Sequence, residues 1–256
     1  MRPHVRSAHL AVPFLIGLCV SQVARAQSYI TTAASTHAQL NAEEIVTNMV
    51  RRNLERAHAL GAYQGTRIYR LDYSGFLGSR SAEMTVDVTY RSPGFKEFHI
   101  RTQKGSQFLI DRVFQRLIQS EKEAMTEESQ GRVALNNDNY IFTLEGFENT
   151  AAGSSYILSV EPRTKDKLLY RGRIWVNAAD FAVMRIEAAP AKNPSFWTKE
   201  TKIEQVYAKV GDFWLPVSNR STSSIRLGGH AYFAIDYQDY RIAAATTVTR
   251  KVGEYR

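Results

Sequence analysis

The stretch "MTVDVTY", residues 84–90, alternates apolar and polar side chains without a break. Met84, Val86, Val88 and Tyr90 lie on one side of an extended chain, and two threonines and an aspartate lie on the other. Strict alternation is typical of an antiparallel strand with one dry face and one face in water. We therefore expect an α+β fold that is mainly β.

The same pattern continues on both sides of this stretch. "EFHIR" (97–101) places Phe98 and Ile100 on one face, and the second half of the chain reads as a meander. Its segments are "YIFTLEG", "SYILSVEP", "LLYRGRIWVN", "FAVMRIEAA", "KETKIEQVYAKV", "FWLPVSNRSTSSIRL" and "HAYFAIDYQDYRI". Turn signals separate them, and the total is about ten strands. No linker rich in Pro, Ser or Gly divides the set, so we expect one domain over 41–242.

A helix is expected to begin at Asn41, which can cap it together with Glu44 three residues later, and to end at Gly61. Its apolar side is expected to consist of Ile45, Met49 and Leu54, with Ala42, Val46 and Ala57 nearby. Its polar side is expected to carry Arg51, Arg52, Glu55 and Arg56.

A second helix is expected within 106–129, capped by Ser106. Its apolar residues at helical spacing are Leu109, Val113, Phe114, Leu117 and Ile118. We expect its far end, with Glu121, Glu123, Glu127 and Glu128, to lie in water.

The N-terminus has the pattern of a secretory signal. Basic residues precede the apolar run "LAVPFLIGLCV" (10–20), and Ala24-Arg25-Ala26 forms an A-x-A site, so we expect 1–26 to be cleaved. The only cysteine, Cys19, lies in this segment. A periplasmic location is expected, with full secretion as the alternative. Residues 27–40 are expected to be a flexible lead-in and 243–256 a flexible tail.

The motifs of common enzyme classes are absent from the sequence. There is no GxSxG, HExxH, GxGxxG or phosphate-binding glycine loop, and His37, His58, His99 and His230 are isolated. No cofactor, metal or catalytic residue is expected. The net charge of +8 indicates solubility or an anionic surface, and we expect no nucleic-acid partner for an exported chain.

The stretch "VYAKVGDFWLPVSNRS" (206–221) is apolar on both sides of one strand. Phe213 and Leu215 share one side, and Trp214 and Pro216 share the other. Pro216 cannot donate to a ladder, which indicates an edge or a bulge. Such a strand must be covered twice, and "NPSFW" (193–197) is expected to supply one cover as a flap.

Over residues 41–242 the layout resembles the LolA/LolB-like superfamily of lipoprotein carriers, through an uncharacterised exported member. The resemblance rests on "YILSVEPRTKDKLLYRGRIWVNAADFAVMRIE" (156–187), where a strand ending in Glu-Pro-basic leads into a hairpin with an Asn-x-x-Asp turn. It also rests on "YAKVGDFWLPVSNRS" (207–221), which is similar to the strand pair that follows in the family.

The resemblance implies an unclosed half-barrel whose helices cover a concave apolar face that shelters acyl chains. The expected lining residues are Met84, Val86, Val88, Phe98, Ile100, Phe114, Ile174, Val176, Met184, Ile186, Phe213, Leu215, Val217, Phe233 and Ile235. The register of the later strands is open, because both faces of "RIWV" and "FWLPV" are apolar.

A basic hairpin is a second candidate surface. Arg163, Lys165, Lys167, Arg171 and Arg173 surround one acid, Asp166. They could dock an anionic lipid or an acidic partner such as an envelope membrane protein, or simply protect a sheet edge from aggregation.

The sequence therefore favours a non-enzymatic periplasmic carrier or sensor that binds lipid or lipoprotein acyl chains. The alternative is a cell-envelope structural or interaction protein with a filled core. A hydrolase with dispersed catalytic residues ranks last.

Overall fold

The computed structural model describes residues 19–20, 40–76, 78–125, 131–150, 153–166, 168–193, 198–226 and 228–244. Outside these residues lie most of the expected signal (all of 1–26 except Cys19 and Val20), the lead-in before Leu40, residues 194–197 of the expected flap, and the tail beyond Ala244.

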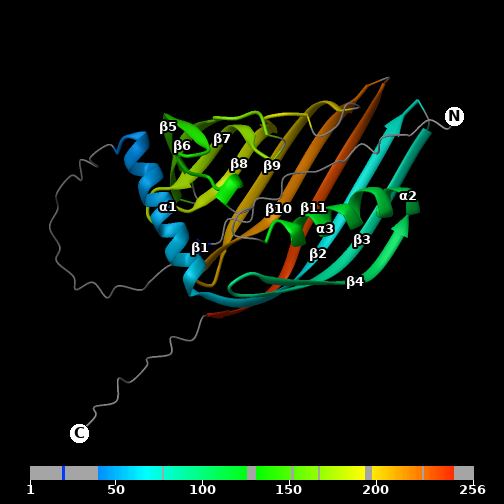
Figure 1. The fold of residues 1–256 in the computed structure, drawn as a ribbon, viewed down its shortest axis with the longest axis horizontal. Coiled ribbons are helices and arrows are strands. Elements are labelled where there is room, and N and C mark those ends of the chain that lie inside the picture. The colour runs from blue at the N-terminus through cyan, green and yellow to red at the C-terminus, as the bar shows by residue number, and fades with distance from the viewer. Residues whose placement is uncertain are drawn as a thin grey trace, which may run out of the picture.

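The chain forms one open antiparallel sheet of ten strands, which confirms the expected mainly β fold (Figure 1). The strands are β2 (Leu60–Gly75), β3 (Gly78–Arg91), β4 (Phe95–Gly105), β5 (Tyr140–Thr150), β6 (Gly153–Pro162), β7 (Tyr170–Asn177), β8 (Val183–Pro190), β9 (Thr198–Val210), β10 (Phe213–Ile225) and β11 (Gly229–Ala244). Their order is β4-β3-β2-β11-β10-β9-β8-β7-β6-β5, and a short strand β1 (Cys19–Val20) pairs with β10. The meander is therefore interrupted only where β2 pairs with β11.

Two helical elements lie on the same side of the sheet (Figure 1). The first is α1 (Ala42–Ala59), and the second is a continuous helical segment made of α2 (Gln107–Leu109), the π-helical turn η1 (Ile110–Phe114) and α3 (Gln115–Glu123). Each element has its own hydrophobic cluster. The cluster that we call the β2–β3 cluster contains the 107–123 segment, β2, β3 and parts of β10 and β11. The cluster that we call the β6–β8 cluster contains α1 and β5 to β8.

Helix α1 begins with the expected capping box. The Glu44 N–H donates to Asn41 Oδ1 at 3.0 Å, and the Asn41 N–H donates to Glu44 Oε2 at 2.8 Å. Its two faces differ from the expected ones at one turn. Leu54 is 57% exposed and Arg56 is fully buried, so the assignment of Leu54 to the apolar side and of Arg56 to the polar side was wrong. Arg56 is buried because it reaches Asp180, in the turn between β7 and β8, which periodicity alone does not reveal.

Strand β10 separates the two clusters at its first residues. Phe213 and Leu215 belong to the β2–β3 cluster, Trp214 belongs to the β6–β8 cluster, and all three are less than 10% exposed. The pairing of β10 with β9 shifts between Pro216 and Ser218, which confirms the expected bulge. This strand is apolar on both sides because it is the wall between two cores.

Candidate functional site

The residues predicted to line a groove divide between the two clusters. The β2–β3 cluster holds Met84, Val86, Val88, Phe114, Phe213, Leu215, Phe233 and Ile235, with Phe98 packed against it. The β6–β8 cluster holds Ile174, Val176 and Ile186, with Met184 packed against it. Val217 is half-buried at the bulge, and Ile100 is 40% exposed on β4. The structure thus brings all of the predicted residues except Val217 and Ile100 together in two buried clusters.

The 107–123 segment is the cover of the first core. Its inward side chains are Leu109, Ile110, Val113, Phe114, Leu117 and Ile118, all at most 8% exposed. Phe114 lies between the rings of Tyr69 and Phe233, with centroid distances of 5.8 and 6.3 Å. Beneath this cover lies a continuous apolar surface of β2, β3 and β11.

A buried ion cluster fixes the end of this cover to the sheet. Glu121 of α3 accepts from Arg67 of β2 at 2.7 Å and from Lys96 of β4 at 2.6 Å. Glu121 and Arg67 are each 3% exposed and Lys96 is 8% exposed. The prediction that Glu121 lies in water was therefore wrong, because two cations on the sheet draw this carboxylate inward.

The two cations of this cluster stabilise the ionised form of Glu121. Burial acts to raise the pKa of Glu121, but the Arg67 guanidinium and the Lys96 ammonium outweigh it and lower that pKa below its ordinary value. The Arg67 guanidinium also lies over the rings of Tyr237 and Phe98, at 5.1 and 5.6 Å from their centroids. Glu121 is thus ionised at neutral pH in spite of its burial.

Helix α1 is fixed to its own half of the sheet by a different charged group. The fully buried Arg56 donates to the Asp180 backbone oxygen and lies 3.6 Å from its carboxylate. The other oxygen of the Asp180 carboxylate accepts from the Trp214 indole at 2.8 Å and lies 3.8 Å from the Lys209 ammonium. Asp180, in the turn between β7 and β8, therefore links the first helix to the wall strand β10.

The sheet opens beside this wall strand. Pairing between β10 and β11 begins only at Ser218 and Asp236, and β11 turns toward β2 through an irregularity between Gln238 and Arg241. Asp239, inside that irregularity, has a φ of 56°. Within the described residues, the first residues of β10 therefore pair with β9 on one side and with β1 on the other, where Cys19 lies opposite Trp214.

The basic hairpin uses part of its charge within the molecule. Arg173 pairs with Glu145 at 2.6 Å, Arg171 donates to the Ala191 backbone oxygen, and Arg163 donates to the Asn137 backbone oxygen. Lys165 is exposed, and Lys167 lies outside the described residues.

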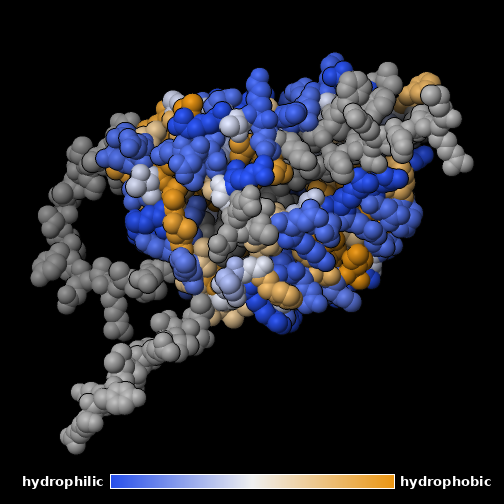
Figure 2. Space-filling model, in the orientation of Figure 1, coloured by the Kyte–Doolittle hydropathy of each residue, from blue (hydrophilic) through white to orange (hydrophobic). Residues whose placement is uncertain are grey.

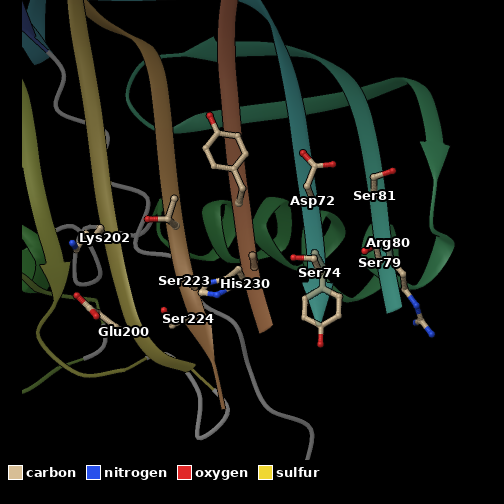
Figure 3. A pocket seen from close by; sticks show the side chains of 14 residues that line it. Asp72, Ser74, Ser79, Arg80, Ser81, Glu200, Lys202, Ser223, Ser224 and His230 are labelled. Atoms are coloured by element: carbon tan, nitrogen blue, oxygen red, sulfur yellow. The ribbon is translucent and has the colours of Figure 1, made fainter. Parts of the chain in front are cut away.

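A polar basin of about 660 Å³ lies on the face of the sheet away from the helices (Figure 3). Cross-strand pairing places its side chains in two rows: Lys202, Thr222, Tyr232, Asp72 and Ser81, then Glu200, Ser224, His230, Ser74 and Ser79. None of the predicted site residues lines it. Most of its lining residues carry polar side chains and it is open to solvent, which is unlike an enclosed site for an apolar guest.

Figure 2 shows that the helix-bearing side is hydrophilic over much of its described surface, with an apolar stripe along α1. Among the residues that the structure describes, no group of three or more His, Cys, Asp or Glu residues is placed to hold a metal. Nor does any helix in the same residues have both the length and the apolar content that crossing a bilayer requires.

Sequence reasoning missed the two buried charged groups. The signal for the first was available: Arg67 and Lys96 interrupt otherwise apolar strand faces, and Glu121 follows Ile118 by one helical turn. Arg56 likewise follows Arg52 at the helical spacing of a buried face, but the identity of its partner depends on the distant turn at Asp180.

No protein-family model matches the chain, and no curated protein matches it. It is similar to a solved domain of a putative outer membrane lipoprotein-sorting protein from Vibrio parahaemolyticus, at 12% identity and a TM-score of 0.39, over 81% of this chain and 94% of that one. A DUF1329 family protein from Desulfovibrio piger gives 14% identity and a TM-score of 0.39, over 81% and 95%. A LolA superfamily protein from Nitrosomonas europaea gives 9% identity and a TM-score of 0.35, over 81% and 96%.

These solved structures include LolA-like proteins, the class that the sequence was found to resemble. At these identities and TM-scores the site must be interpreted from this chain's own residues.

Proposed function

We propose that this chain is a non-enzymatic periplasmic binding protein, a carrier or sensor, that shelters an acyl chain of a lipid or lipoprotein beneath its 107–123 segment. The observation that carries the proposal is the form of the cover. One helical segment lies over an apolar sheet surface and is anchored at its end by ion pairs. It can therefore be exchanged for another apolar body without breaking the sheet.

The energies of the two occupants are comparable. The six inward side chains of the segment contribute roughly 1.5–3 kcal/mol each on burial, or about 9–18 kcal/mol together. A sixteen-carbon chain gains about 0.8 kcal/mol for each buried methylene, or roughly 12 kcal/mol when fully sheltered. Because these ranges overlap, the apolar part of the exchange between the segment and an acyl chain would have little net cost.

The proposed contacts are those predicted residues that lie under the segment, chiefly Met84, Val86, Val88, Phe233 and Ile235. All are less than 10% exposed with the cover in place. In this proposal they become accessible when the segment moves, and the Glu121 ion pairs set the cost of that movement.

A covalent staple tests the proposal. The Arg80 guanidinium lies 5.6 Å from the Phe108 ring centroid, and the Phe108 side chain is exposed, so a short bismaleimide between Arg80→Cys and Phe108→Cys would hold the segment to β3. The background carries Cys19→Ser, which removes the only native thiol. We expect uptake of a fluorescent fatty acid to fall at least tenfold on stapling and to be unchanged by the single cysteine variants.

A matched staple within the sheet is the control. Arg185 lies 5.0 Å from the Trp175 ring on the neighbouring strand, far in sequence from the segment. Stapling Arg185→Cys to Trp175→Cys should leave uptake intact. Undiminished uptake by the Arg80–Phe108 staple would contradict the proposal, and so would the absence of any lipid after native mass spectrometry and organic extraction of periplasmic material.

The burial of most predicted groove residues also favours a second candidate, an envelope interaction protein with a filled core. Both clusters are closely packed in the described residues, as that function requires. Charge reversal at Arg171 and Arg173 separates the two candidates, because it should abolish docking of a partner through the basic hairpin and leave fatty-acid uptake unchanged.

A further inference from the structure

At its first residues β10 has a side that β11 does not reach and that the two-residue strand β1 occupies; we call it the open side. Val210 and Phe213 close the β9–β10 hairpin around a two-residue turn, and such a closing pair exchanges backbone hydrogen bonds. Hydrogen-bonding direction alternates along a strand, so Leu215 also points toward β9. The N–H and C=O of Trp214 therefore point the other way.

The neighbouring residues agree with this direction. Pro216 shares the orientation of Trp214, and its carbonyl accepts from the Tyr240 hydroxyl, which comes from the β11 side, at 2.8 Å. Pro216 has no N–H, and a proline is tolerated in a strand where its nitrogen faces away from the ladder. The open side thus extends from Phe213 to Pro216, where the Tyr240 side chain closes it.

Trp214 is buried at this open side. It is 8% exposed, and strand β11 does not reach it because pairing with β10 begins at Ser218. A buried peptide group needs a hydrogen-bond partner, and water has little access here. In the part of the chain that the structure describes, β1 is the strand that occupies this side, with Cys19 opposite Trp214 and Val20 opposite Phe213.

The surroundings define what fits. The side chains of Phe213 and Leu215 enter one apolar cluster and that of Trp214 enters the other. The carboxylate nearest to Trp214, that of Asp180, already binds the indole, Arg56 and Lys209. An occupant must therefore be extended, uncharged and apolar, and it must carry a backbone N–H and C=O, which an acyl chain lacks.

We propose that Phe213–Pro216 is a docking edge for an extended apolar segment of a partner polypeptide, bound by strand addition to Trp214. This site is independent of the acyl-chain proposal, because strand addition here requires no movement of the 107–123 segment. The added strand is short, since Pro216 cannot donate and its carbonyl is taken by Tyr240.

A peptide pair tests the proposal. The probe is a fluorescent peptide of sequence LIGLCVSQ, which reproduces residues 15–22, and its partner carries one N-methyl group on the cysteine nitrogen. The protein is the full chain with Cys19→Pro, which removes the N–H of its own β1 segment and so vacates the edge. Fluorescence anisotropy should show binding of the probe and about fivefold weaker binding of the methylated peptide, the loss of one backbone hydrogen bond. Equal affinities would overturn strand addition.

A thiol test fixes the register without relying on affinity. With Trp214→Cys added, a peptide whose cysteine is activated as its 2-pyridyl disulfide should exchange with the new thiol within minutes, forming the protein–peptide disulfide and releasing pyridine-2-thione, because the two positions lie directly opposite. Trp175→Cys, on β7, is the matched control and should react slowly. Equal trapping at both positions would refute the register, and the Arg80–Phe108 staple should leave peptide binding unchanged even where it blocks fatty-acid uptake.

Discussion

Neutralising Glu121 should cost this protein a large part of its stability. Glu121→Gln keeps the size of the side chain and removes its charge, which leaves Arg67 and Lys96 buried together without a counter-charge. All three are at most 8% exposed, and the carboxylate oxygens lie 2.7 and 2.6 Å from the two cations. Removing one partner of a buried ion pair costs about 3–5 kcal/mol.

The assay is equilibrium unfolding in urea, followed by tryptophan fluorescence. A loss of about 3–5 kcal/mol is a large fraction of the 5–15 kcal/mol typical of a folded domain. Glu123→Gln is the matched control, because Glu123 lies on the same helix and, among the described residues, accepts from the exposed Gln119. A loss below about 1 kcal/mol for Glu121→Gln would refute the reasoning, since surface substitutions commonly have effects of that size.

The pH dependence gives the same prediction a second readout. The folded-state pKa of Glu121 is lowered below its ordinary value of about 4.3, so its contribution is complete above that pH. It is lost as the pH falls through the lowered folded-state value, because the unfolded chain then binds the proton more readily. The unchanged protein should therefore lose stability relative to Glu121→Gln as the pH falls below about 4. Parallel pH profiles would show that Glu121 is not the titrating group.

The remaining predictions concern the first helix and the sheet. Arg56→Met should destabilise the protein by about 2 kcal/mol, below the usual cost of a broken buried pair because Asp180 is partly exposed, while Leu54→Ser should change stability by less than about 0.5 kcal/mol in the same urea assay. Trp214→Phe should cost about 1 kcal/mol through loss of the indole hydrogen bond, and an unchanged midpoint would deny that bond any role. Gly172→Ala should lower the melting temperature strongly, because its Cβ would lie 2.1 Å from a backbone oxygen at a φ of 153°.

Much of the fold could be predicted from local patterns. The alternation in "MTVDVTY" gave the correct dry face, since Met84, Val86, Val88 and Tyr90 are all buried, and the Asn41–Glu44 pair gave the start of α1. Both signals act between residues close in sequence, which is why they can be recognised without a structure.

The errors arose where the burial of a side chain depends on a partner that is distant in the sequence. Arg56 and Glu121 are charged, and hydropathy alone places such side chains in water. They are buried because Asp180, Arg67 and Lys96 lie opposite them on other elements. The separation of the predicted groove residues into two clusters depends in the same way on where β11 leaves β10, which the sequence marks only by the unusual stretch at 213–216.

The pairing of β2 with β11 determines the order in which this chain can fold. All other neighbouring strands of the ten-stranded sheet follow one another along the chain. The 107–139 region connects β4 and β5, which lie at opposite edges of the sheet. Strand β2 (Leu60–Gly75) therefore waits for β11 (Gly229–Ala244), the last strand to emerge during synthesis or translocation. Until then the β2–β3 cluster lacks Phe233 and Ile235, while β5 to β9 can already assemble with α1. The half of the molecule that contains β2 and β3 is thus completed last, although both strands are made early, and a nascent chain stalled before residue 229 would present its unfinished apolar face to chaperones.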